Sequence, residues 1–264
     1  QADRLRCLLQ KLGYSDKDQT HKDPHRSVLF LGDLIDRGRQ NRAVIDIVRS
    51  MVENGQAQAI LGNHEYNAIC FHSADPESDQ PLRPHDDKNI KQHRTFLEEY
   101  PIGTPETLDV IEWFKTLPLF LDVGEFRAVH AAWDQGAVEP CLGPNKSLTK
   151  ALLRDSACPG SSVHRVLETL LKGPEIALPE ALRIEDKSGH IRKDQRIKWW
   201  EFDGPKSFRN LALARTELVD RLPDHELPEF SLPVIYPADA PPVFFGHYSL
   251  DPISQHPVQS SNTI

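Results

Sequence analysis

The sequence has little that would tie it to a membrane or to a disulfide framework. No apolar run in its 264 residues approaches the roughly 20 that cross a bilayer, and no signal peptide opens the chain. Its cysteines, Cys7, Cys70, Cys141 and Cys158, are scattered without a C-x-x-C pair, which indicates a reducing compartment. We therefore expect a cytoplasmic protein that does not bind membranes.

The sequence also lacks an excess of basic charge and internal repeats. Lysine and arginine total 31 against 39 acidic residues, giving a formal net charge of -8. This balance disfavours non-specific nucleic-acid binding and still allows a local basic pocket. The chain opens on Gln1 rather than methionine and stops at Ile264 without a helix cap. We therefore expect one domain over 1–264, truncated at both ends, and the oligomeric state is left open.

Two apolar runs end in the same kind of polar turn. Residues 27–31 precede Gly-Asp-Leu-Ile-Asp-Arg-Gly, and residues 57–61 precede Gly-Asn-His-Glu. Between them, residues 44–52 carry an apolar stripe with helical spacing. A strand, a helix and a strand over this length predict a βαβ unit with parallel strands. Their carboxyl ends then share one sheet edge, which brings Asp33 and Asn63 together.

The remaining chain predicts further helices and strands, separated by two irregular regions. Expected helices run from the first residues to about 12, from 104 to before Pro118, from 163 to 173 and from 207 to about 221. Hairpins are expected at 119–131 and around 187–189, a strand at 243–245, and a polar loop at 15–26. We interpret 73–104 as an inserted loop or lid and 140–240 as an insertion or cap region without a catalytic pattern.

Four expected strand ends finish in side chains that bind metals. These are Asp33, Asn63, His130 and His247. Divalent transition metals take oxygen from carboxylates or amides and nitrogen from neutral imidazole. A single histidine after a strand is more often a core or surface residue. Four strands that are each followed by a metal-binding side chain favour a metal site.

These motifs resemble a known family. The Gly-Asp-Leu-Ile-Asp-Arg-Gly and Gly-Asn-His-Glu blocks are similar to the second and third signature blocks of the calcineurin-like metallophosphoesterases. The likeness is closest to the branch with Ser/Thr phosphoprotein phosphatases and bacterial diadenosine tetraphosphate hydrolases. Val129-His130 and Gly246-His247 resemble its later histidine blocks, so the resemblance covers about 1–135 and 241–250. It implies an α/β fold: a two-sheet β-sandwich flanked by helices in α/β/β/α layers.

The resemblance further implies a hydrolase with two divalent metal ions, which could be manganese, iron, zinc or nickel. Asp33 would bridge both ions, and Asn63, His130 and His247 would hold the second. Two such ions activate a hydroxide and clamp the phosphate.

The resemblance also assigns catalytic roles beside the metals. His64 would protonate the leaving oxygen and Asp36 would orient it. Arg37 would bind the substrate phosphate through its planar fork. The simpler interpretation of Asp36 and Arg37 is a surface ion pair. The substrate class stays open between phosphoproteins and dinucleoside polyphosphates.

One departure weakens the expected activity. The family's first block, Gly-Asp-x-His-Gly, is absent, so the first-site ligands are incomplete in this chain. His21 and His25 lie in the polar loop and are expected to be solvated rather than substitutes. We predict weak or absent hydrolysis of p-nitrophenyl phosphate. The alternative is a non-catalytic metal-binding or scaffold remnant of the family.

Other features are less specific. Trp199-Trp200, beside several cationic residues, could stack nucleotides, but half-buried packing is the favoured interpretation. The irregular spacing of His72, His85 and His93 favours a mobile lid over a metal site. A second arginine clamp for phosphate is not identified among the inserted candidates, which are Arg165, Arg183, Arg192 and Arg196.

Overall fold

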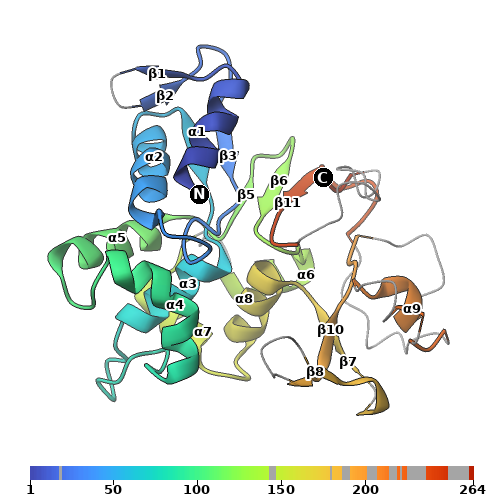
Figure 1. Cartoon of the computed structure of the whole chain (residues 1–264). Coiled ribbons are helices and arrows are strands. Elements are labelled where there is room, and N and C mark those ends of the chain that lie inside the picture. The colour runs from blue at the N-terminus through green and yellow to red at the C-terminus, as the bar shows by residue number, and fades with distance from the viewer. Residues whose placement is uncertain are drawn as a thin grey trace.

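The chain forms a mixed α/β structure of several small sheets and surrounding helices (Figure 1). The computed structural model describes residues 1–17, 20–142, 147–178, 180–185, 191–200, 207–213, 219–220, 222–224, 236–248 and 262–264. The predicted α/β fold is confirmed. The elements that matter for the site belong to two sheets, one built from β3 and β4 and one from β5, β6 and β11.

The first sheet is the predicted βαβ unit. Strands β3 (Val28–Phe30) and β4 (Ala57–Ala59) are parallel, with Val28 opposite Ala57 and Phe30 opposite Ala59. Helix α2 (Asn41–Glu53) connects them and buries its apolar stripe against β4, as its spacing predicts. Helix α1 (Ala2–Lys11) packs on α2 (Figure 1).

The second sheet combines a local hairpin with a strand from far along the chain. Strands β5 (Phe120–Asp122) and β6 (Arg127–Val129) form the predicted antiparallel hairpin. Strand β11 (Val243–Phe245) pairs in parallel with β6, with Phe245 opposite Val129. The backbone N–H of Gly246 donates to the carbonyl of His130 at 3.0 Å. The residues that follow β6 and β11 therefore leave the sheet side by side.

The other elements lie outside these two sheets (Figure 1). Their bounds are β1 Ser15–Lys17, β2 Thr20–Lys22, α3 Asn63–His72, α4 Asp87–Glu99, α5 Pro105–Thr116, α6 Gln135–Leu142, α7 Lys150–Ala157, α8 Ser162–Lys172, β7 Glu175–Ala177, η1 Glu180–Leu182, β8 Ile184–Glu185, β9 Ile191–Arg192, β10 Asp194–Arg196 and α9 Phe208–Leu211. Two of these helices begin at residues that capping rules predict. Helix α5 has Thr104 as N-cap with proline in its first turn, and α8 is capped by Ser161 and stops at Gly173.

The main core extends into the region interpreted as a cap. The apolar face of α8 and the pair Trp199-Trp200 belong to the same buried cluster as the N-terminal helices. Trp199 is 1% exposed, so the tryptophan pair packs in the interior, as favoured from the sequence. A smaller cluster forms separately around Ile176, Ile197 and Phe208. Part of residues 140–240 therefore helps to build the core.

Three local expectations differ from the structure. The polar loop expected at 15–26 contains the antiparallel hairpin β1–β2, in which His21 is buried rather than solvated. The segment interpreted as a loop or lid contains α4, whose residues His93 and Phe96 are buried. Asp86 accepts a hydrogen bond from the Asn89 N–H and starts this helix.

The C-terminal half shows two further differences. The helix expected over 207–221 ends as α9 at Leu211, where Ala212 is extended and forms a bridge with Ile197, and residues 214–218 and 221 of the expected helix lie outside the described residues. The hairpin expected around 187–189 is present as β8 and β9, with its tip outside the described residues. Strand β10 pairs with β7 rather than extending this hairpin. Within the described part of the chain, no helix is long and apolar enough to cross a membrane.

Candidate metal centre and adjoining cavity

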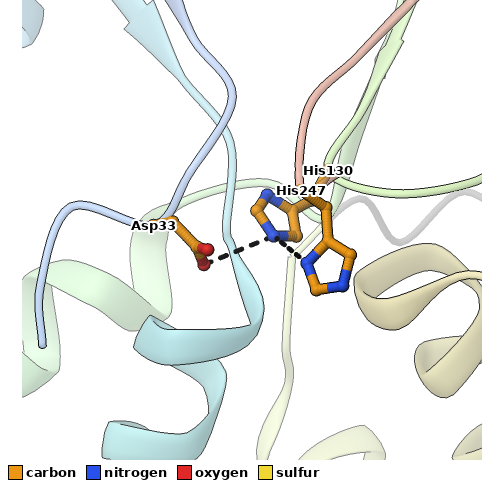
Figure 2. A group of neighbouring side chains, drawn as sticks. All are labelled: Asp33, His130 and His247. Atoms are coloured by element: carbon orange, nitrogen blue, oxygen red, sulfur yellow. Dashed lines mark hydrogen bonds and ion pairs between the residues drawn. The ribbon is translucent and has the colours of Figure 1, made fainter. Parts of the chain in front are cut away.

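Four side-chain donor atoms converge where the two sheets end. His130 Nε2 lies 3.1 Å from Asn63 Oδ1, 3.1 Å from His247 Nδ1 and 3.3 Å from Asp33 Oδ1. Figure 2 shows Asp33 reaching toward the two histidines from a separate loop. The four residues follow β3, β4, β6 and β11, so the parallel pairings create this cluster.

The donor set fits a cation better than a network of hydrogen bonds. His130 Nδ1 contacts the carbonyl of Leu31, which can only accept, so this nitrogen carries a proton, and in the neutral ring Nε2 presents its lone pair to the site. The facing Asp33 and Asn63 oxygens are acceptors as well. One proton on His247 cannot satisfy all these contacts, whereas a divalent cation accepts lone pairs from all four atoms.

The protonation states also suit metal binding. Burial raises the pKa of the Asp33 carboxyl, but the hydrogen bond and charge of His130 outweigh burial and lower it to about 2. Burial, followed by the charges of Arg196 and His130, lowers the pKa of His247 to about 3. An ionised carboxylate and a neutral imidazole are the forms that ligate a metal.

The backbone at the site is held in uncommon conformations. Asp33, Asp36 and His247 have φ values of 58°, 70° and 64°, in the left-handed region that non-glycine residues seldom adopt. Such conformations cost about 1–3 kcal/mol each and persist only where the surroundings enforce them. They turn these side chains out of their strands and toward the site.

Two glycines allow the strand ends to approach closely. A Cβ on Gly32 would lie 2.4 Å from the nitrogen of Gly62. A Cβ on Gly62 would lie 2.3 Å from the nitrogen of Asp33. No side chain fits at either position, so the glycine of each block is required by the contact that joins Asp33 to Asn63.

Glu65 is a residue of the site whose role the sequence did not reveal. Its carboxylate is fully buried and accepts backbone N–H groups from Asp33 at 2.9 Å, Leu34 at 2.8 Å and Gly62 at 3.0 Å. It therefore fastens the loop after β3 to the loop after β4. Burial, followed by the nearby charge of Asp33, raises the pKa of Glu65.

Asp36 binds two histidines beside the metal ligands. Its Oδ2 lies 2.9 Å from His64 Nδ1, and its Oδ1 lies 2.9 Å from His93 Nδ1. Burial raises the pKa of Asp36, but hydrogen bonds from His64 and His93 outweigh it and keep the pKa below its ordinary value. Burial lowers the pKa of His64, but the bond to Asp36 and the charge of Asp33 raise it overall. His93 was interpreted as part of a lid, and its contact with Asp36 had no local sequence signal.

A cavity of about 580 Å³ adjoins these groups. Its wall includes Asn63, His64 and His247, and it carries a strong excess of positive charge. The cationic side chains in the wall are Arg37, Arg83, Lys88, Lys172 and Arg196, and the carboxylate is Asp36. Arg37 Nε donates to His64 Nε2 at 3.3 Å.

One of the four candidate arginines from the inserted region lines this cavity. It is Arg196. Arg165 instead donates to a backbone carbonyl, and Arg183 pairs with a glutamate one turn away. The side chain of Arg192 lies outside the described residues.

The sequence-predicted residues therefore lie together. Asp33, Asn63, His130 and His247 share donor contacts, and the Asp36–His64 pair with Arg37 borders the same cavity. Their roles remain predictions. Among the described residues, one group of at least three histidine, cysteine or acidic side chains has converging ligand atoms, Asp33 with His130 and His247.

Comparison with known proteins gives the family of the chain. The sequence profile of the calcineurin-like phosphoesterase family matches residues 1–164. The symmetrical bis(5'-nucleosyl)-tetraphosphatase of Ralstonia nicotianae is 24% identical over 224 residues, covering 83% of this chain and 69% of that protein. The asymmetrical bis(5'-nucleosyl)-tetraphosphatase PrpE of Oceanobacillus iheyensis is 26% identical over 153 residues, covering 57% of this chain and 58% of that protein.

A shorter match is closer in sequence. The asymmetrical bis(5'-nucleosyl)-tetraphosphatase PrpE of Bacillus velezensis is 41% identical over 64 residues, covering 24% of this chain and 25% of that protein. These relatives support the predicted class, a hydrolase acting on phosphoester bonds. With the family profile matching well over half of its length, the chain belongs to the calcineurin-like phosphoesterase family.

Proposed function

We propose that the protein is a metal-dependent phosphoester hydrolase whose metal is held by Asp33, Asn63, His130 and His247. The observation that carries the proposal is the convergence of their ligand atoms around His130 Nε2. A bound divalent ion would supply Lewis-acid stabilisation of the phosphoryl charge and lower the pKa of an attacking water. The mixed oxygen and nitrogen donors suit manganese, iron, zinc or nickel, and manganese is the first ion to test.

The second ion that the family resemblance implies is part of the proposal only through Asp33. Its Oδ1 lies 3.3 Å from His130 Nε2, and we propose that this carboxylate would be the ligand shared by the two ions. The rival proposal, a metal-binding remnant without catalysis, draws on the single ligand group found among the described residues.

The residues beside the metal ligands would handle the proton and the phosphate. Asp36 accepts from His64 Nδ1, which fixes the ring and favours its charged form. In that form His64 Nε2 carries a proton and can no longer accept from Arg37 Nε–H, so both nitrogens become donors that need another acceptor. Oxygens of a phosphate ester would meet this need, so His64 would protonate the leaving oxygen while Arg37 holds the phosphate.

A dinucleoside polyphosphate is the substrate class we favour over a phosphoprotein. The cavity wall has several cations and one carboxylate, which already binds two histidines. Several phosphates in a chain could each pair with a cation of this wall, whereas the single phosphate of a phosphoprotein would leave most of these cations unpaired. The names of the relatives, which are tetraphosphatases, point in the same direction. We propose Arg196, which lines the cavity, as the second arginine that clamps the reacting phosphate beside Arg37.

The test measures phosphate or nucleotide release with manganese and with EDTA. A dinucleoside tetraphosphate and a phosphoserine peptide would be compared. We expect slow, manganese-dependent hydrolysis of the dinucleotide that Asn63→Ala abolishes, because Asn63 supplies a ligand oxygen. Full activity in Asn63→Ala would refute the scheme. Manganese binding without any hydrolysis would favour the remnant.

We also propose that the protein works in the cytoplasm. Cys7, Cys70, Cys141 and Cys158 are all free thiols, and Cys7 and Cys158 are exposed. Exposed free thiols persist under reducing conditions. Fractionation of cells that express the protein would test this, and recovery from an oxidising compartment would contradict it.

A further inference from the structure

The wall of the cavity contains an arginine whose guanidinium and backbone are both held by hydrogen bonds. Arg83 lies in the segment between α3 and α4, and it lines the same cavity as His64 and His247. Its Nη1 donates to Asn67 Oδ1 at 2.8 Å, and its Nη2 donates to Gln92 Oε1 at 2.9 Å. One partner is on α3 and the other on α4, so two helices hold the guanidinium.

The backbone of Arg83 is anchored as well. Its N–H donates to the carbonyl of Cys70 at 3.0 Å, near the end of α3. The neighbouring N–H of Leu82 donates to the backbone carbonyl of Ser73 at 2.9 Å. The arginine is therefore positioned before any ligand arrives, which lowers the entropic cost of binding.

The charge of Arg83 is not neutralised by these contacts. Both partners are uncharged amides, and within the described ranges no carboxylate lies at ion-pair distance from Arg83. Other cavity cations differ: Lys172 lies 2.7 Å from a carboxylate oxygen of Glu168, and Arg196 lies 3.4 Å from Glu175. A guanidinium with two donors used keeps further N–H groups for an anion.

The wall of the same cavity includes a second cation. Lys88, near the start of α4, lines the cavity and is exposed, and it has no ion pair among the described residues. Asp36, the carboxylate of the wall, is occupied by His64 and His93. Arg83 and Lys88 therefore offer two uncompensated positive charges to an anion that enters the cavity.

We propose that Arg83, assisted by Lys88, forms a second anion subsite that binds a phosphate of the substrate beyond the one at the metal centre. The subsite selects a polyphosphate chain over the monoester of an uncharged alcohol. This inference rests on the proposed function, and it adds Arg83 as the residue that determines the specificity for a polyphosphate chain. Arg83 acts by binding the chain, while the Asp36–His64 pair and Arg37 serve the reacting phosphate.

The test is direct binding by isothermal titration calorimetry, so that it does not depend on turnover. Inorganic tripolyphosphate and orthophosphate would be titrated into the full chain at low salt without added metal. Arg83→Gln removes the charge, and Arg94→Gln is the matched control, because Arg94 is exposed on the nearby helix α4 and is not among the residues that line the cavity. Circular dichroism would establish that each variant folds.

We expect Arg83→Gln to weaken tripolyphosphate binding about tenfold or more, the usual loss for a charge-assisted bond. Arg94→Gln should change it less than about threefold, and neither variant should change orthophosphate binding more than that. Equal affinities of the two variants for tripolyphosphate would overturn the subsite. If Arg83→Gln does not fold, Arg83→Lys replaces it: it keeps the charge without the fork, and unchanged affinity there would overturn the subsite equally.

The outcome is separable from that of the proposed function. If the wild-type protein releases no phosphate with manganese but Arg83→Gln selectively loses tripolyphosphate, the hydrolase proposal fails and the subsite stands. If hydrolysis occurs and binding is unaffected, the subsite fails alone. In an active enzyme, Arg83→Gln should raise KM for a dinucleoside tetraphosphate about tenfold and leave KM for p-nitrophenyl phosphate unchanged.

Discussion

Replacing Glu65 by glutamine should destabilise the protein through the loops that carry the metal ligands. Oε2 accepts the N–H groups of Asp33 and Gly62, and Oε1 accepts that of Leu34. A glutamine has one oxygen, and its best orientation keeps the two N–H bonds and turns an NH₂ toward the N–H of Leu34. One buried donor then loses its partner, which costs about 1–3 kcal/mol.

The assay is urea unfolding of metal-free protein followed by circular dichroism. We expect the free energy of unfolding to fall by about 2 kcal/mol, roughly a 30-fold change in the folding equilibrium. Glu98→Gln is the control, since Glu98 is exposed and an exposed substitution should change stability by less than about 0.5 kcal/mol. A Glu65→Gln variant as stable as Glu98→Gln would refute the idea that this carboxylate joins the two loops.

Three further perturbations test separate parts of the account. Gly62→Ala should lower the free energy of unfolding, measured in urea, by about 2 kcal/mol or more, because the new Cβ would lie 2.3 Å from the backbone nitrogen of Asp33. Gly136→Ala is the control and should be neutral, because its Cβ would make an ordinary contact at 3.6 Å. Asp36→Asn should reduce kcat for a dinucleoside tetraphosphate about 10-fold to 100-fold. It should reduce kcat for a p-nitrophenyl ester less, because that leaving group needs no proton. Equal losses of kcat for the two substrates would contradict the role of His64 as an acid oriented by Asp36. Burial, then the charges of neighbouring histidines, lowers the pKa of His72 to about 4. The unfolded chain, with a pKa of about 6.5, takes up this proton first, so stability is complete above about pH 6.5 and falls toward pH 4. His72→Gln should flatten that fall in urea titrations, and an unchanged slope would contradict it.

The metal ligands could be placed from sequence because they follow strands directly. Parallel pairing of β3 with β4 brings Asp33 to Asn63, and that inference needs only the βαβ spacing. The proximity of His130 and His247 depends on β11 pairing with β6 from more than a hundred residues away. Local periodicity carries no information on that pairing, so the family resemblance supplied it.

The residues that sequence reasoning missed act through contacts between distant loops. Glu65 could have served as a metal ligand, a helix cap or a clamp, and only its three N–H partners distinguish these roles. His93 and Arg83 were missed because residues 73–91 are polar, which favoured a loop over the whole segment. The missed signal was Asp86 as an N-cap, followed by buried positions at His93 and Phe96 with helical spacing.

Titration of manganese followed by electron paramagnetic resonance tests the central claim most directly. Unbound manganese gives the free signal, so the bound fraction can be measured for wild type, Asn63→Ala and the control Asn67→Ala on the same helix. We predict that Asn63→Ala weakens manganese binding at least about tenfold, while Asn67→Ala leaves it within about threefold. Equal manganese affinity in wild type and Asn63→Ala would contradict a metal centre built from Asp33, Asn63, His130 and His247.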